Sequence, residues 1–139
     1  MLKILATICI IGMATSSCTS KKASRTESSH EAEPELTMIV GTYTSGDSKG
    51  LYSFRFNEEN GTATALSEAE VENPSYLVPS ADGKFIYAVS EFSNDQAAAN
   101  AFAFNKEEGT FRLLNTQKTE GEDPCYIITN GSNCLLYTS

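Results

Sequence analysis

The chain has 139 residues, a formal net charge of −8 and no tryptophan. The excess of acidic side chains argues against a nucleic-acid partner and against docking on anionic lipid, because both surfaces attract basic patches. The four cysteines show no Cys-x-x-Cys or Cys/His spacing, so the sequence predicts neither a disulfide framework nor a metal site.

The first 17 residues have the features of an export signal. Lys3 supplies the positive start, and residues 4–13 form an apolar run that is about half of the roughly twenty residues needed to span a bilayer. Small residues then precede Cys18, which resembles the lipobox of bacterial lipoproteins. We expect residues 1–17 to be a lipoprotein signal peptide and Cys18 to carry a lipid, the protein's only contact with a membrane. This places the protein in the bacterial cell envelope. The alternative is a plain secretory signal with an incidental cysteine.

Residues 18–35 are polar and charged, with almost no large apolar side chains. Such a segment cannot bury enough surface to offset its chain entropy, so we expect a disordered tether after the lipidated cysteine. The single histidine of the chain, His30, lies in this tether. We therefore expect it to be solvated rather than catalytic or metal-binding.

From residue 36 onward, short strand-like segments alternate with turns. Residues 38–43 and 51–56 are strand-like, and the turn Asn57–Gly61 follows. Further along, residues 85–91 follow the turn Ser80–Gly83. No segment has the 3.6-residue periodicity of a long helix. The sequence thus predicts an all-β fold.

The strand pattern occurs twice. The segment from Ser53 aligns with that from Ala101 at an offset of 48, and Asn73-Pro74 aligns with Asp123-Pro124 at an offset of 50. A period of about fifty residues with four strands is typical of a β-propeller blade, whereas a two-sheet sandwich would not predict a repeat. We expect residues 36–133 to form the first two blades.

Strand positions follow from this alignment. The innermost strand should begin at Ser75 and again at Cys125, and residues 38–43 should be the second strand of an incomplete first blade. Five phenylalanines are expected to pack in the blade core: Phe54, Phe56, Phe85, Phe102 and Phe104.

Three motifs in this order resemble the opening blades of the lactonase-type seven-bladed propellers. They are VGTYT at Val40–Thr44, NPSYL at Asn73–Leu77 and SADGKFIYAVSE at Ser80–Glu91. That family includes 6-phosphogluconolactonases and carboxymuconate-lactonizing enzymes. The resemblance covers about residues 38–130 and implies a seven-bladed propeller, of which this chain contains about two blades. It also implies opening or closing of a lactone ring without a cofactor.

The resemblance favours a lactone hydrolase of the 6-phosphogluconolactonase type, which in the full-length protein would hydrolyse a sugar lactone to the acid. A non-catalytic envelope propeller and a muconate-type cycloisomerase are the alternatives. In relatives, catalysis is attributed to histidine, arginine and glutamate residues of later blades. Here Arg55 and Arg112 fall in outer strands. We assign no catalytic residue and expect the segment alone to be inactive.

In a propeller, the junctions between blades and the ends of the second strands share one face around the central channel. We expect seven residues on this substrate face: Tyr43, Asn73, Ser75, Glu91, Asp123, Cys125 and Tyr126.

Simpler interpretations exist for several of these residues. Glu91 can be a solvated charge at a strand end, Cys125 a small buried hydrophobic residue, and Asn73 and Asp123 turn formers before proline. Tyr126 stands where relatives often carry histidine, which weakens a functional role for this second junction.

The last six residues, 134–139, can be encoded by the end sequence of a common transposon-based sequencing adaptor. We expect the genuine protein sequence to run to about Asn133 and the remainder to be a read-through artefact. The alternative is a natural strand, since Leu135 and Leu136 align with Phe85 and Ile86.

Overall fold

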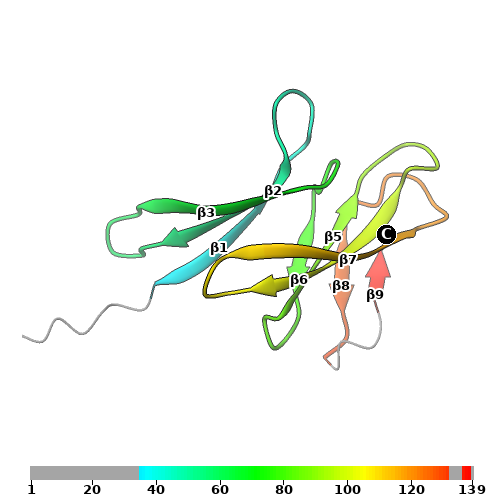
Figure 1. Cartoon of the computed structure of the whole chain (residues 1–139). Helices are drawn as coiled ribbons and strands as arrows, with labels where there is room; N and C mark the ends of the chain where they lie inside the picture. Colours follow the sequence, from blue (N-terminus) through cyan, green and yellow to red (C-terminus); the bar gives the residue numbers. More distant parts are fainter. Residues whose placement is uncertain (1–34, 132–135, 139) are drawn as a thin grey trace, which may run out of the picture. The chain divides into compact units, whose positions relative to one another are not determined.

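Short strands joined by tight turns build three antiparallel sheets (Figure 1). The computed structural model describes residues 35–131 and 136–138. The first sheet contains β1 (Leu36–Gly41), β2 (Gly50–Phe56) and β3 (Ala63–Glu70), in that spatial order. In the described part of the chain it has no fourth strand on the β1 side, as expected for an incomplete first blade.

The second sheet is a complete four-stranded blade. Its strands lie in sequence order: β4 (Leu77–Pro79), β5 (Phe85–Ser90), β6 (Ala98–Asn105) and β7 (Thr110–Lys118). Each strand pairs antiparallel with the next. The blade architecture predicted from the repeat is therefore confirmed.

A third sheet begins with β8 (Ile127–Thr129) and β9 (Leu136–Thr138). Its register repeats that of the second blade at an offset of 50 residues, because Ile127 pairs with Thr138 as Leu77 pairs with Ala88. β9 thus takes the place of β5. Residues 1–34, 132–135 and 139 lie outside the described residues, so the signal peptide, the lipidated cysteine, the tether and the adaptor origin of 134–139 stay predictions.

The repeat extends to the turn that follows the third strand of each blade. The Asn57 side-chain oxygen accepts hydrogen bonds from the amides of Glu59 and Asn60, as the Asn105 oxygen does from Glu107 and Glu108. Each turn closes on a glycine in the left-handed region, Gly61 at φ 71° and Gly109 at φ 72°. An asparagine that bonds its own turn and a glycine free to adopt positive φ explain why this pattern makes a turn in both blades.

A β-bulge also occurs at the same place in both blades. Ser53 pairs with Ser67 but Phe54 pairs with Ala65, which leaves Leu66 without a partner across the strands. In the second blade the register shifts in the same way and leaves Leu114 unpaired. Leu66 and Leu114 are equivalent in the 48-residue repeat. An extra residue of this kind increases the local strand twist, so both outer strands twist at equivalent points.

The innermost strands begin two residues later than predicted. β4 starts at Leu77 rather than Ser75, and β8 at Ile127 rather than Cys125. The reason is the backbone before each proline, where Asn73 has φ 46° and Asp123 has φ 52°. A residue with positive φ cannot be part of an extended strand, so the chain makes a turn before it joins the sheet.

The main core lies where the first two sheets pack together. Its buried residues are Leu51, Ile86, Ala88, Phe102 and Phe104. Phe102 and Phe104 are therefore core residues as expected, whereas Phe54, Phe56 and Phe85 are only half-buried. In β2, successive side chains point to opposite faces of the sheet. Leu51 and Ser53 occupy the fully buried face, whereas Tyr52, Phe54 and Phe56 are half-buried.

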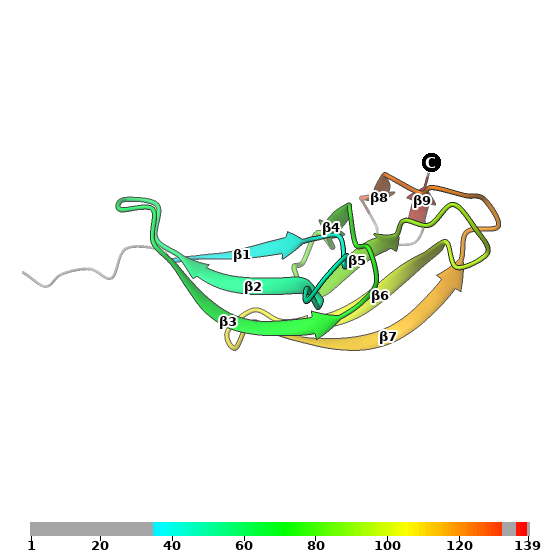
Figure 2. The same ribbon diagram turned by 90° about the horizontal axis from the view of Figure 1, so that it is seen from above.

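The outer strands of the two blades, β3 and β7, run beside each other (Figure 2).

Buried polar side chains in the second blade have hydrogen-bond partners. Asn100 donates from Nδ2 to Ser90 Oγ at 2.9 Å and accepts at Oδ1 from Thr116 Oγ1 at 2.8 Å. None of the described residues belongs to a helix that is long and apolar enough to cross a bilayer.

Candidate functional site

Equivalent side-chain hydrogen bonds hold the two junctions between blades. The Asn73 side-chain oxygen accepts from the Thr44 amide at 3.1 Å and from Thr44 Oγ1 at 3.0 Å. One blade further on, Asp123 Oδ1 accepts from Ser93 Oγ at 2.6 Å. In each case, a hydroxyl after the end of a second strand holds the residue that precedes the proline of the next blade.

The side chains of Asn73 and Asp123 are therefore engaged in holding the junctions. Asn73 also donates from Nδ2 to the Glu91 carbonyl at 3.2 Å, and its own carbonyl accepts from the Glu91 amide at 3.1 Å. The Asp123 amide donates to the Phe92 carbonyl at 2.9 Å. These two residues hold the neighbouring loops, and the side-chain oxygens Asn73 Oδ1 and Asp123 Oδ1 have partners within the protein.

A cluster of three polar side chains forms beside the first junction. Ser75 Oγ donates a hydrogen bond to Glu91 Oε2, and Tyr43 interacts with both residues through its hydroxyl. The residues come from three places in the chain: Tyr43 follows β1, Ser75 precedes β4 and Glu91 follows β5. The fold thus brings together three of the seven predicted site residues.

The cluster perturbs the Tyr43 hydroxyl. The hydrogen bond to Glu91 raises the pKa of Tyr43 above its ordinary value, and desolvation and the Glu91 charge act in the same direction. The hydrogen bond with Ser75 opposes this shift. Tyr43 is nevertheless 55% exposed, and Ser75 and Glu91 are half-buried. Glu91 is therefore more than a solvated charge at a strand end, since two hydroxyls from other segments contact its carboxylate.

Cys125 and Tyr126 begin the next junction. Cys125 is a free thiol and is exposed, so the interpretation of Cys125 as a buried hydrophobic residue is wrong. The Tyr126 ring packs on the Tyr76 ring with their centroids 4.8 Å apart.

The chemistry available here is hydrogen bonding to a polar ligand. A carboxylate accepts hydrogen bonds, and serine and tyrosine hydroxyls both donate and accept them. Arg55 is used elsewhere, because its Nη2 donates to the Glu107 carbonyl at 2.7 Å and its Nε lies 3.5 Å from Glu35. Arg112 is exposed on β7. Among the described residues, no group of three or more His, Cys, Asp or Glu side chains converges as a metal site would require.

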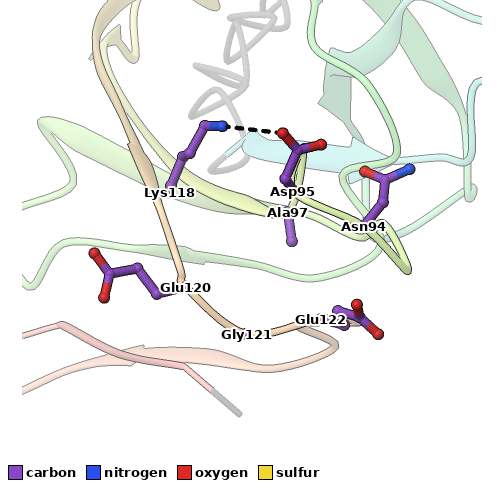
Figure 3. A pocket seen from close by; sticks show the side chains of 7 residues that line it. All are labelled: Asn94, Asp95, Ala97, Lys118, Glu120, Gly121 and Glu122. Carbon is purple, nitrogen blue, oxygen red and sulfur yellow. Dashed lines mark ion pairs between the residues drawn. The ribbon is translucent and has the colours of Figure 1, made fainter.

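A separate cleft of about 360 Å³ lies between the β5–β6 loop and the β7–β8 junction (Figure 3). Its charged lining is mainly acidic, and Lys118 pairs with Asp95 at 3.6 Å. None of the seven predicted site residues lines it. The lining is mainly acidic and its lysine is already ion-paired, so we assign no function to this cleft.

Sequence reasoning missed three residues that contribute to this region: Thr44, Ser93 and Tyr76. A signal for Tyr76 was present, because the 50-residue offset aligns it with the predicted site residue Tyr126. Thr44 and Ser93 gave no such signal, since their partners lie about thirty residues away in the chain and only the closed blade brings them together.

The model of the family "Lactonase, 7-bladed beta-propeller" matches residues 37–139. The chain belongs to the seven-bladed lactonase family. The blades described above are accordingly part of a seven-bladed propeller, and the family resemblance seen in the sequence is confirmed.

Two curated relatives share about a third of their aligned residues with this chain. The 6-phosphogluconolactonase of Bacillus subtilis is 33% identical over 104 residues, which cover 72% of this chain and 29% of that protein. The 6-phosphogluconolactonase of Formosa agariphila is 34% identical over 107 residues, covering 73% and 30%. The chain therefore spans less than a third of the length of the curated relatives that it matches.

Solved structures agree with the fold. A protein of Bacteroides fragilis, proposed to be a 6-phosphogluconolactonase, superposes with a TM-score of 0.70 at 70% identity, covering 73% of this chain and 28% of that one. A periplasmic gluconolactonase of Pseudomonas aeruginosa superposes with a TM-score of 0.68 at 25% identity, covering 75% and 30%.

Proposed function

We propose that the full-length protein containing this chain is a lactone hydrolase of the 6-phosphogluconolactonase type, which opens a sugar lactone to the acid. The observation that carries the proposal is the alignment with relatives named 6-phosphogluconolactonase in two distant bacteria, over nearly three quarters of this chain. The local geometry is compatible with it, because the exposed Tyr43 and the half-buried Ser75 and Glu91 offer hydrogen bonds to a polyhydroxylated ligand.

The residues described here suit binding better than catalysis. Lactone hydrolysis needs a base for the attacking water and donors or a cation for the developing oxyanion. Glu91 is hydrogen-bonded to Ser75, and the arginines Arg55 and Arg112 lie in strands rather than in the junctions. We therefore assign the substrate-face residues to recognition of the sugar and keep catalysis for residues of later blades.

A direct rate measurement tests the proposal. The purified full-length protein is mixed with glucono-1,5-lactone or its 6-phosphate, and proton release is followed with a pH indicator against spontaneous hydrolysis. We expect acceleration of at least one of the two lactones. Rates equal to the uncatalysed ones for these and other sugar lactones would contradict the proposal and leave the two alternatives, a non-catalytic propeller that binds its ligand and a muconate-type cycloisomerase.

We also propose that the protein is anchored in the bacterial cell envelope by a lipid on Cys18. The short apolar run, the small residues and the cysteine at its end support this proposal. A gluconolactonase described as periplasmic among the structural relatives makes an exported lactonase chemically reasonable. Such an enzyme would meet sugar lactones outside the cytosol.

Two cysteine variants test the anchor. Cells that express the full-length protein are labelled with a fatty-acid probe, and the protein is partitioned between detergent and water. Cys18→Ser should abolish the label and move the protein to the aqueous phase, whereas Cys9→Ser, in the apolar run, should change neither. Retention of the label in Cys18→Ser contradicts the proposal.

A further inference from the structure

Tyr76 and Tyr126 occupy the same place in two successive blade junctions, immediately before the innermost strands β4 and β8. Their ring centroids are 4.8 Å apart and their planes are inclined by 47°. Each residue is 40% exposed. In the part of the chain that the structure describes, the two rings contact each other and keep part of their surface exposed.

The groups next to this pair are polar. Ser75 directly precedes Tyr76 in the chain, and Cys125 directly precedes Tyr126. Ser75 in turn binds the Glu91 carboxylate. The hydrogen-bonding cluster therefore adjoins the aromatic pair at the first junction.

A partly exposed aromatic surface beside a carboxylate matches the chemistry of a sugar ring. One face of such a ring presents electropositive C–H groups, which are attracted to the negative face of an aromatic ring. Its hydroxyls donate hydrogen bonds, for which a carboxylate is a strong acceptor. The negative charge of Glu91 suits hydroxyls rather than a phosphate, so this part of the site fits the uncharged ring.

We propose that Tyr76 and Tyr126 form an aromatic platform on which the ring of the sugar lactone lies while Glu91 and Ser75 bind its hydroxyls. The inference rests on the lactone hydrolase function proposed above and names the residues that recognise the substrate ring. It adds Tyr76 to the substrate face and gives Tyr126 a role that does not need a histidine at that position.

The test compares steady-state kinetics of leucine and phenylalanine variants of the full-length protein on glucono-1,5-lactone. Tyr76→Leu and Tyr126→Leu should each raise KM about threefold to tenfold, the effect of losing an aromatic contact, with kcat nearly unchanged. Tyr76→Phe and Tyr126→Phe keep the ring face and should keep KM. Tyr87→Leu is the matched control, because Tyr87 is half-buried and packs against the cluster that contains Val89 and Ile127. It should lower the melting temperature without a change in KM.

Two outcomes overturn the platform, and they are separate from failure of the proposed function. Leucine variants that melt like Tyr87→Leu but keep the wild-type KM show that the tyrosines only pack the blades. If the wild type hydrolyses no lactone, the proposed function fails, and saturation-transfer NMR with 1,5-anhydroglucitol, a sugar ring that cannot hydrolyse, decides the platform. Transfer to the ring protons that is lost in the leucine variants supports it, and absent or unchanged transfer overturns it. If a leucine variant does not fold, absent transfer to the wild-type protein still overturns the platform.

Discussion

Ser53 Oγ donates a 2.6 Å hydrogen bond to the carbonyl oxygen of Gly109, which joins the first blade to the turn of the second. Ser53 is fully buried. The same carbonyl accepts a second hydrogen bond from Ser67 Oγ at 2.7 Å. Two serines on neighbouring strands of one blade therefore satisfy a single buried carbonyl of the next blade.

Removing these hydroxyls should destabilise the protein in a non-additive way. Ser53→Ala and Ser67→Ala should each cost about 1 kcal/mol, because the other serine still binds the Gly109 carbonyl. The double variant removes both hydroxyl donors and should cost about 3 kcal/mol or more. Urea unfolding measures the three free energies, with the exposed Ser45→Ala as a control that should change little. Additive costs would show that the two bonds are independent.

The two equivalent turn glycines should respond differently to alanine. A Cβ on Gly109 would lie 2.6 Å from Leu66 Cδ1 and 2.8 Å from Ser53 Oγ, whereas a Cβ on Gly61 meets nothing within 4 Å. Their φ values are 72° and 71°, so the left-handed backbone penalty of about 1–2 kcal/mol is common to both. In the chain described here, Gly109→Ala should cost about 1–3 kcal/mol more than Gly61→Ala, because of these two glycines Gly109 alone is packed against a neighbouring blade among the described residues. Equal losses in thermal or urea unfolding would contradict the blade packing.

The first junction should depend mainly on Asn73. Asn73→Gly accommodates φ 46° but loses the bonds to Thr44 and to the Glu91 carbonyl, so it should cost about 2–3 kcal/mol. Thr44→Val keeps the bond from the Thr44 amide but loses both bonds of Oγ1, the one donated to Asn73 Oδ1 and the one accepted from the Asn73 amide, and should cost about 1 kcal/mol. Ser93→Ala removes the equivalent bond at the second junction and should behave like Thr44→Val. The free energies of unfolding, measured with urea, rank these variants. If Asn73→Gly loses no more stability than Thr44→Val, Asn73 does not have a central role in the junction.

The Tyr43 hydroxyl should titrate at a higher pH than an ordinary tyrosine. The Glu91 hydrogen bond raises its pKa, so the folded state favours the protonated phenol. The resulting stabilisation is present below the unfolded-state pKa of about 10 and is lost as the pH rises through the folded-state pKa.

Absorbance of tyrosinate at alkaline pH checks this expectation. The difference between wild type and Tyr43→Phe isolates the Tyr43 titration from that of the other tyrosines. Glu91→Gln should lower the Tyr43 pKa toward the ordinary value, because the carboxylate charge is removed. An unchanged titration in Glu91→Gln would mean that Glu91 does not act on Tyr43.

Local chemistry made much of the fold predictable. The asparagines at 57 and 105 and the glycines at 61 and 109 form turns through contacts within a few residues. Such short-range patterns, repeated at a fixed period, indicated blades and the order of their strands. The start of β4 was placed two residues early because a left-handed residue before proline cannot be read from alternation alone.

The sequence by itself determined the all-β blade repeat, the positions of the two prolines at the blade junctions and the family, because alternation, turn chemistry and motif order are local along the chain. Only the tertiary structure decided which junction residues meet. It brought Tyr43, Ser75 and Glu91 into one cluster, engaged Asn73 and Asp123 in holding the junctions, and exposed the Cys125 thiol. The physical reason is that these contacts join segments from different blades, and their geometry is set by the packing of one sheet on the next.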